Sequence, residues 1–242
     1  MLIKPYFFIL LIPLVLSYCS CEKGDSASQE NLLQASAPFN PGETITYAVK
    51  YLGVKTGTAT ITFRGIQPYK GKEFYLIVFS AQGPNFFDEE KIYADKETFY
   101  PAVVLRDLNI WGKKEKILEE YDQAAGRIKI TKTANNKTSG ENLQKNSPVD
   151  NIYCFIYRSR QSGQFNPGDS FAIHLPTRDI KINLVKRTAL KVGGENYQTY
   201  FMESDPAKYK VWFETGSRKV PLRINGAMGI SDTSMIMTDY KN

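Results

Sequence analysis

Residues 39–63, FNPGETITYAVKYLGVKTGTATITF, contain two segments in which apolar and polar side chains alternate. In residues 44–51 every second side chain is Ile, Tyr or Val, and the period of two returns in residues 58–63. Such alternation is typical of a strand with one buried face, because successive side chains point to opposite sides of a sheet. Residues 52–57 interrupt the pattern and contain two glycines. Two strands around a glycine-bounded turn predict an antiparallel hairpin.

Further segments with strand character follow one another to the C-terminus, separated by turns rich in Gly, Pro and Asn. One of them, residues 74–79, is continuously apolar, which predicts burial of both its faces. Strands at such short spacing predict an antiparallel sheet without β–α–β crossovers. About a dozen strands can bury their apolar faces only if the sheet curls or closes. We therefore predict an all-β, mainly antiparallel fold with a strongly curved or barrel-like sheet.

One segment, residues 148–160, is predicted to form a helix packed against the sheet. Ser147 suits the N-cap, Pro148 suits the first turn, and Asp150 completes a capping box. The polar residues 133–146 before it are predicted to form a mobile loop. The helix is either part of the core or a lid over the interior of the sheet. Its apolar stripe, which would be core or face a ligand, consists of Val149, Ile152, Tyr153 and Ile156.

The N-terminus has the features of an export signal. A positive Lys4 precedes an apolar run of about ten residues, too short to cross a bilayer as a helix but typical of a signal-peptide core. We predict a signal peptide at residues 1–20, a disordered tether at residues 21–38, and a single curved antiparallel β domain at residues 39–242.

The boundary after the signal peptide resembles a bacterial lipoprotein signal, in which a cysteine after a small residue carries the lipid. Ser20 precedes Cys21, so we predict lipid attachment at Cys21. Cys19 is the alternative, although the bulky Tyr18 precedes it. Lipidation would place the protein on the periplasmic side of a bacterial membrane, and simple secretion without an anchor is the other possibility.

The composition argues against several classes of function. The formal net charge is +6, but the basic residues are spread along the 242-residue chain, which favours a solvated surface over a nucleic-acid partner. Two of the three cysteines lie at the leader boundary and Cys154 lies in the body, so a disulfide framework is excluded. No Cys/His spacing fits zinc, and we predict no metal and no cofactor.

No residue pattern indicates catalysis, and we predict that the protein is not an enzyme. His174 is the only histidine, lies in a predicted strand, and is interpreted as a structural or surface residue. The acidic groups at residues 88–90 and 119–122 are interpreted as solvated loops, because neighbours in a strand point to opposite faces. Trp212 is predicted to line a ligand cavity or to belong to the core.

Several motifs together resemble the bacterial family called domain of unknown function 3108, and they occur in order over nearly all of residues 39–240. The resemblance implies an exported, mostly β domain, and it implies no catalytic residues. The motifs are Phe39-x-Pro-Gly-Glu-x-x-x-Tyr-x-Val-x-Tyr-x-Gly-x-x-x-Gly-x-Ala, Tyr121-Asp122-Gln123-Ala124-Ala125-Gly126, the stretch from Asp150 to Arg158, Val211-Trp212-Phe213, Arg218-Lys219-Val220-Pro221-Leu222, and Gly229.

These observations predict an exported and lipid-anchored envelope protein. Our first functional hypothesis is non-enzymatic binding of an apolar ligand or an envelope protein partner on the concave sheet. The second is a structural or assembly factor of the envelope without a small-molecule cavity. A hydrolase is the third and least favoured, because it would need titratable groups gathered in a cavity.

Overall fold

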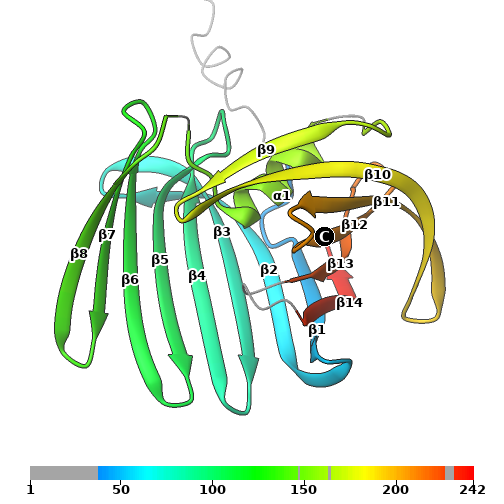
Figure 1. Cartoon of the computed structure of the whole chain (residues 1–242), viewed down its shortest axis with the longest axis horizontal. Helices are drawn as coiled ribbons and strands as arrows, with labels where there is room; N and C mark the ends of the chain where they lie inside the picture. The colour runs from blue at the N-terminus through cyan, green and yellow to red at the C-terminus, as the bar shows by residue number, and fades with distance from the viewer. Residues whose placement is uncertain (1–37, 147, 163–164, 227–231) are drawn as a thin grey trace, which may run out of the picture. The chain divides into compact units, whose positions relative to one another are not determined.

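Fourteen strands of the described chain form one antiparallel sheet, which curls around a single helix (Figure 1). The computed structural model describes residues 38–146, 148–162, 165–226 and 232–242. The predicted signal peptide, nearly all of the tether, both candidate lipidation cysteines, Ser147 and Gly229 lie outside the described residues. Within them, the prediction of an antiparallel, strongly curved sheet with one helix is confirmed.

Eight strands precede the helix and six follow it. The first eight are β1 (Thr44–Tyr51), β2 (Val54–Tyr69), β3 (Lys72–Gly83), β4 (Phe86–Ala94), β5 (Pro101–Ile110), β6 (Lys113–Asp122), β7 (Arg127–Ala134) and β8 (Lys137–Gln144). Helix α1 spans Ile152–Gln161. The remaining strands are β9 (Ser170–Leu175), β10 (Arg178–Val192), β11 (Glu195–Asp205), β12 (Lys210–Glu214), β13 (Pro221–Asn225) and β14 (Thr233–Lys241).

Sequential hairpins build each half of the sheet, and one long-range pairing joins the halves. Strand β1 pairs with β14, for example Val49 opposite Met235, so that β8 and β9 become the two edges. The segment before α1 connects the two halves of the sheet. The Asp150 amide donates to the His174 carbonyl on β9 at 2.7 Å. The Gln123 side chain both accepts from the Val149 amide at 2.8 Å and donates to the Val149 carbonyl at 2.9 Å.

The main core lies on one face of the strands, as their alternation predicts. In the first hairpin the inward side chains are all nearly inaccessible, namely Ile45, Tyr47, Val49, Ala59, Ile61 and Phe63. The predicted burial of both faces of residues 74–79 is wrong: Ile77 and Phe79 are buried, whereas Leu76 and Val78 on the other face are half-buried. A continuous apolar run does not distinguish a strand covered on both sides from one covered on a single side.

The turn of the first hairpin is tighter than the sequence suggests. Strand β2 begins at Val54, so Gly57 lies inside a strand rather than in the turn. Gly53 has a φ of +83°, a conformation that favours glycine. Gly57 has another reason to be glycine, because a Cβ there would lie 2.2 Å from the Gln82 carbonyl oxygen on β3. Close backbone approach therefore explains the second glycine.

Helix α1 begins later than predicted. Asn151, not Ser147, is the N-cap, and its side-chain oxygen accepts from the Tyr153 amide at 2.8 Å. Val149 and Asp150 remain outside the helix because their backbone groups bond to Gln123 and to β9. Asp150 also pairs with Arg158 rather than completing a capping box. Among the described residues, no helix has the length and apolar character needed to cross a membrane.

The predicted loop at residues 133–146 is mostly a hairpin. It contains the end of β7 and all of β8, joined at Asn135 and Asn136, which both have positive φ. The prediction is wrong because β8 is an edge strand whose side chains are exposed, apart from a half-buried Leu143. A strand without a buried face has no apolar alternation for the sequence to reveal.

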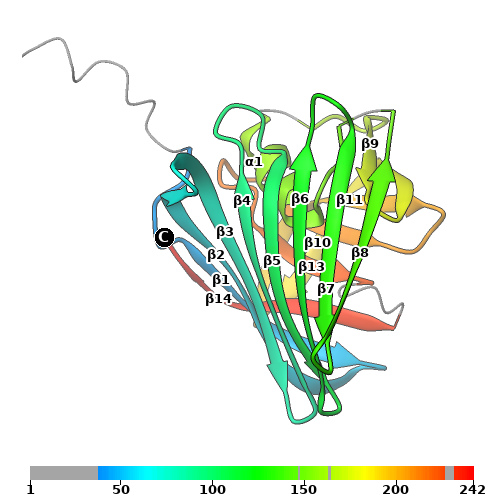
Figure 2. The same cartoon turned by 90° about the vertical axis from the view of Figure 1, so that its left-hand side faces the viewer.

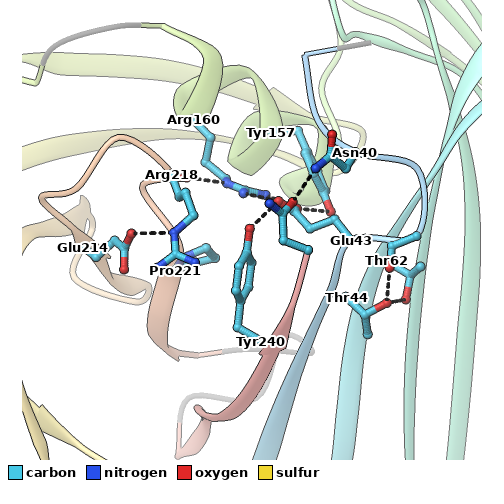
Figure 3. Close-up of polar contacts among 12 residues, drawn as sticks. Asn40, Glu43, Thr44, Thr62, Tyr157, Arg160, Glu214, Arg218, Pro221 and Tyr240 are labelled. Carbon is cyan, nitrogen blue, oxygen red and sulfur yellow. Dashed lines mark hydrogen bonds and ion pairs between the residues drawn. The ribbon is translucent and has the colours of Figure 1, made fainter.

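A buried ion pair holds α1 against the start of β1 and against β14 (Figure 3). Two guanidinium nitrogens of Arg160 donate to the two carboxylate oxygens of Glu43, each at 2.7 Å. The hydroxyl groups of Tyr240 and Tyr157 donate to the same carboxylate at 2.9 and 3.4 Å. Arg160 also donates to the Arg218 carbonyl at 3.1 Å. These bonds satisfy both charges, as a buried pair requires.

Candidate functional site

A cavity of about 210 Å³ lies between α1 and the C-terminal strands of the sheet. The helix forms one wall, strands β9, β10, β12, β13 and β14 with two flanking residues form the opposite wall, and β4 and β5 contribute two charged side chains. Most of the lining is apolar. The lining residues are Glu90, Arg106, Ile152, Tyr153, Phe155, Ile156, Leu175, Ile182, Tyr209, Val211, Ile224, Gly226 and Met235.

The helical wall of the cavity is held rigidly by aromatic contacts. The Tyr153 ring stacks on Phe79 of β3 with centroids 4.5 Å apart, and the Phe155 ring meets Phe171 of β9 edge-on at 6.1 Å. One turn further, Tyr157 packs against Phe63 at 5.5 Å. Because α1 contacts both halves of the curled sheet, the helix is part of the core and at the same time a wall of the cavity.

Charged side chains meet at the β4–β5 side of the cavity. The Arg106 guanidinium donates to both carboxylate oxygens of Asp88, from Nε at 2.7 Å and from Nη2 at 2.6 Å. Arg106 Nε also lies 3.4 Å from Glu90 Oε1. The other Glu90 oxygen accepts from the Asn151 side chain at 3.4 Å. The bidentate geometry makes Asp88 the main ion-pair partner of Arg106. Both contacts of Glu90 are longer, at 3.4 Å.

Burial changes the protonation of the carboxyl groups on this inner face. Loss of solvent raises the pKa of Glu90 to about 7, although the positive charge of Arg106 opposes that shift. Burial also raises the pKa of Glu119 on β6, against the hydrogen bond that the Tyr121 hydroxyl donates to it. Near neutral pH the cavity therefore contains a carboxyl group that can either donate or accept a hydrogen bond.

The interpretation of both acidic segments as loops is wrong, although the Glu120 and Asp122 side chains are in contact with solvent. Residues 88–90 lie within β4, and residues 119–122 form the end of β6. Asp88 is 1% exposed and Glu90 is 9% exposed, because side chains two positions apart share the inner face with Ile92. The sequence signal for their burial is the spacing of two between Asp88, Glu90 and Ile92, which places all three on one face of a strand.

Three of the five residues predicted to face a ligand or the core line the cavity, and a fourth, Val149, is buried outside it. Tyr153 and Ile156 are buried, and Ile152 is half-buried. Trp212 lies elsewhere: it is half-buried, packs against Phe201 at 4.8 Å and lies on the other face of β12 from Val211. Strand alternation therefore directs Trp212 away from the cavity.

Neither the histidine nor the described cysteine lines this cavity. His174 on edge strand β9 has its Nδ1 3.3 Å from Asp179 Oδ1, and neither residue lines the cavity. The Cys154 thiol is buried, and burial raises its pKa well above the usual value. Among the residues that the structure describes, no three His, Cys, Asp or Glu side chains are grouped so that they could hold a metal ion.

Comparisons with known proteins concern the fold and the family. A crystal structure described as a beta-barrel-like protein of domain of unknown function DUF1849 from Brucella abortus is similar, with a TM-score of 0.44 and 7% identity over 83% of this chain and 97% of that chain. No curated protein matches this sequence. The model of the family described as Protein of unknown function (DUF3108) matches residues 46–238. The chain therefore belongs to the DUF3108 family.

Proposed function

We propose that the domain is a non-enzymatic binding protein of the bacterial cell envelope, and that its interior takes a small apolar ligand or the apolar part of a larger one. The cavity of about 210 Å³ beside α1 carries this proposal. A dry cavity of about 150 Å³ accommodates a benzene molecule, so this one suits a short alkyl chain or a substituted ring. Ligand sites of this kind combine an apolar lining with a few polar groups that orient the ligand.

The charged groups of the cavity favour some polar functional groups on the ligand over others. Among the lining residues Arg106 is the one cation, and its guanidinium is paired with Asp88. Glu90 offers a carboxyl group close to its protonation midpoint near neutral pH. A neutral hydroxyl or a positively charged amine would therefore be favoured over a carboxylate or phosphate, which would be repelled by Asp88 and by ionised Glu90.

The alternative is a structural or assembly factor of the envelope without a small-molecule ligand. The burial of α1 favours it, since seven of the helix residues are buried and fill much of the interior. The two proposals differ in whether the space beside α1 binds anything. A direct binding measurement on a variant with a smaller cavity separates them.

Octanol, octylamine and octanoate, titrated by calorimetry, test the binding proposal. We expect octanol and octylamine to bind, and octanoate to bind about tenfold more weakly or not at all because of Asp88 and Glu90. Val211→Phe places a larger side chain in the cavity wall and should weaken octanol binding by about tenfold. Thermal unfolding of the same sample shows whether the variant keeps its fold.

Trp212→Phe is the matched control, because Trp212 is the neighbour of Val211 on the opposite face of β12. It should leave octanol binding unchanged. If none of the three probes binds, the assembly-factor alternative is favoured. If Trp212→Phe weakens binding and Val211→Phe does not, the ligand lies on the other face of the sheet.

We also propose that the protein is exported and held on the periplasmic side of a membrane by lipid on Cys21. The apolar run after Lys4 and the Ser20–Cys21 boundary support this proposal. Cys21→Ala should move the protein from the membrane fraction to the soluble fraction. Mass spectrometry of the mature N-terminus is the decisive measurement: acyl chains on Cys19 would transfer the assignment to that residue, and an unmodified N-terminus would show secretion without an anchor.

A further inference from the structure

Large apolar side chains are exposed mainly at two hairpin tips. Of the seven that are exposed among the described residues, five lie at these tips. Leu52 and Trp111 are 69% and 74% exposed, and both have positive φ at the point where the chain reverses. The β1–β2 tip contributes Tyr51, Leu52 and Val54, and the β5–β6 tip contributes Ile110 and Trp111.

The two tips lie at the same end of the sheet. Strands β1–β8 are joined by successive antiparallel hairpins, so the tips of β1–β2, β3–β4, β5–β6 and β7–β8 point the same way (Figures 1 and 2). Four strand spacings separate the β1–β2 tip from the β5–β6 tip, a distance on the order of 20 Å. The β3–β4 tip lies between them and is tied to the β5–β6 tip, because the Trp111 amide donates to the Asn85 carbonyl at 2.8 Å.

Lysines flank these two tips and the β7–β8 tip at the same end of the sheet. Among the described residues they form no ion pair with a carboxylate, so their charges are available to a partner. They are Lys50, Lys55, Lys113, Lys114 and Lys137. The acidic groups nearby are fewer: Asp232 lies beside Leu52, while Glu115 is paired with Lys132 at 2.6 Å and Asp107 lies 3.9 Å from Lys116. This end of the domain is therefore positively charged as well as apolar at its tips.

We propose that these hairpin tips dock on the surface of an anionic phospholipid bilayer. Trp and short aliphatic side chains on rigid turns favour the boundary between head groups and acyl chains, where an apolar ring can be buried. Lysines just behind them would reach the lipid phosphates. Charge complementarity distinguishes this partner from an apolar protein groove, which would leave five lysines without anions.

The hairpin tips and the beginning of the domain lie at opposite ends of β1. Residue 44 begins β1 beside α1, whereas Tyr51 ends it at the tips, about 23 Å away along the strand. A chain of the length of residues 21–38 spans at most about 60 Å when extended. A domain attached through Cys21 could therefore still turn its tips toward the same bilayer. Docking of the tips does not require the cavity to be occupied.

Vesicle binding by residues 37–242 tests the proposal. The segment Ala37–Asn242 forms a separate compact unit that contains the whole sheet, the helix and the core, so it can be studied without the N-terminal segment. Trp111 and Trp212 are the two tryptophans, and Trp212→Phe leaves Trp111 as the reporter. With vesicles of phosphatidylglycerol and phosphatidylcholine we expect a blue shift of Trp111 emission and quenching by brominated acyl chains. With phosphatidylcholine alone we expect little binding.

Two sets of variants identify the groups responsible. Leu52→Ser combined with Trp111→Ser should lower the partition coefficient, measured by vesicle flotation, by at least about tenfold. Lys113→Gln and Lys114→Gln should each lower it about fivefold at low salt. Ile66→Ser and Val185→Ser remove the exposed apolar side chains that lie away from the tips, and they should have no effect.

Three results would overturn the proposal. One is a failure of the parent segment to float with anionic vesicles. Another is equal partitioning of the parent and the doubly substituted tip variant, with circular dichroism confirming that both are folded. The third is equal binding to neutral and anionic vesicles, which would reject the role given to the lysines.

Discussion

Replacing Arg160 with methionine should lower the free energy of unfolding by about 3–5 kcal/mol. The side chains of Arg160 and Glu43 are 1% and 3% exposed, so the substitution leaves a carboxylate buried without its cation. Two tyrosine hydroxyls continue to donate to that carboxylate but cannot neutralise it. Urea unfolding followed by circular dichroism measures the change.

The double variant Glu43→Gln with Arg160→Met should recover most of the lost stability. With both charges removed, no ion remains buried, and replacing such a pair by neutral groups is often close to neutral. Lys70→Met is the control, because Lys70 forms a solvent-exposed pair with Glu120 at 3.0 Å, and such surface pairs contribute little to stability. A loss below about 1 kcal/mol for Arg160→Met would show that this pair does not hold α1 in place.

Glu90→Gln should stabilise the protein by up to about 3 kcal/mol at pH 8 and leave its stability nearly unchanged at pH 5. The pKa of Glu90 is about 7 in the folded protein, against 4.5 when the group is in water. Between these two values the folded state holds more protons than the unfolded state, so wild-type stability falls as pH rises through this window. A glutamine at position 90 is neutral at every pH in this window, so it does not lower the stability of the variant as pH rises.

The measurement is the difference in unfolding free energy between variant and wild type at several pH values from 5 to 8. Burial also raises the pKa of Asp150, which is present in both proteins, so its contribution cancels in the difference. Burial raises the pKa of Glu119 as well, and because Glu119 and Glu90 interact electrostatically, Glu119 adds a smaller dependence on pH to the difference. Glu89→Gln is the control, since Glu89 lies on the other face of β4 and pairs with Lys91 at 3.2 Å near the surface. A difference that does not depend on pH would show that Glu90 stays ionised throughout this range.

The candidate site was only partly predictable from the sequence. The apolar stripe of α1 correctly placed Ile152, Tyr153 and Ile156 on one face, and all three line the cavity. The Glu90–Arg106–Asp88 group was missed, because its burial depends on strands that pair with β4 and on the helix that covers it. A pKa of about 7 for a glutamate arises from loss of solvent, and loss of solvent is a property of the packed structure.

The sequence by itself determined the hairpin at residues 44–63 with its inward face, the presence of one helix and the family. Alternation is a local property, since each side chain takes the face opposite to its neighbours. Only the tertiary structure decided that β1 pairs with β14, that residues 137–144 form an edge strand and that α1 begins at Ile152. These features depend on hydrogen bonds between segments far apart in the chain, whose partners no local pattern specifies.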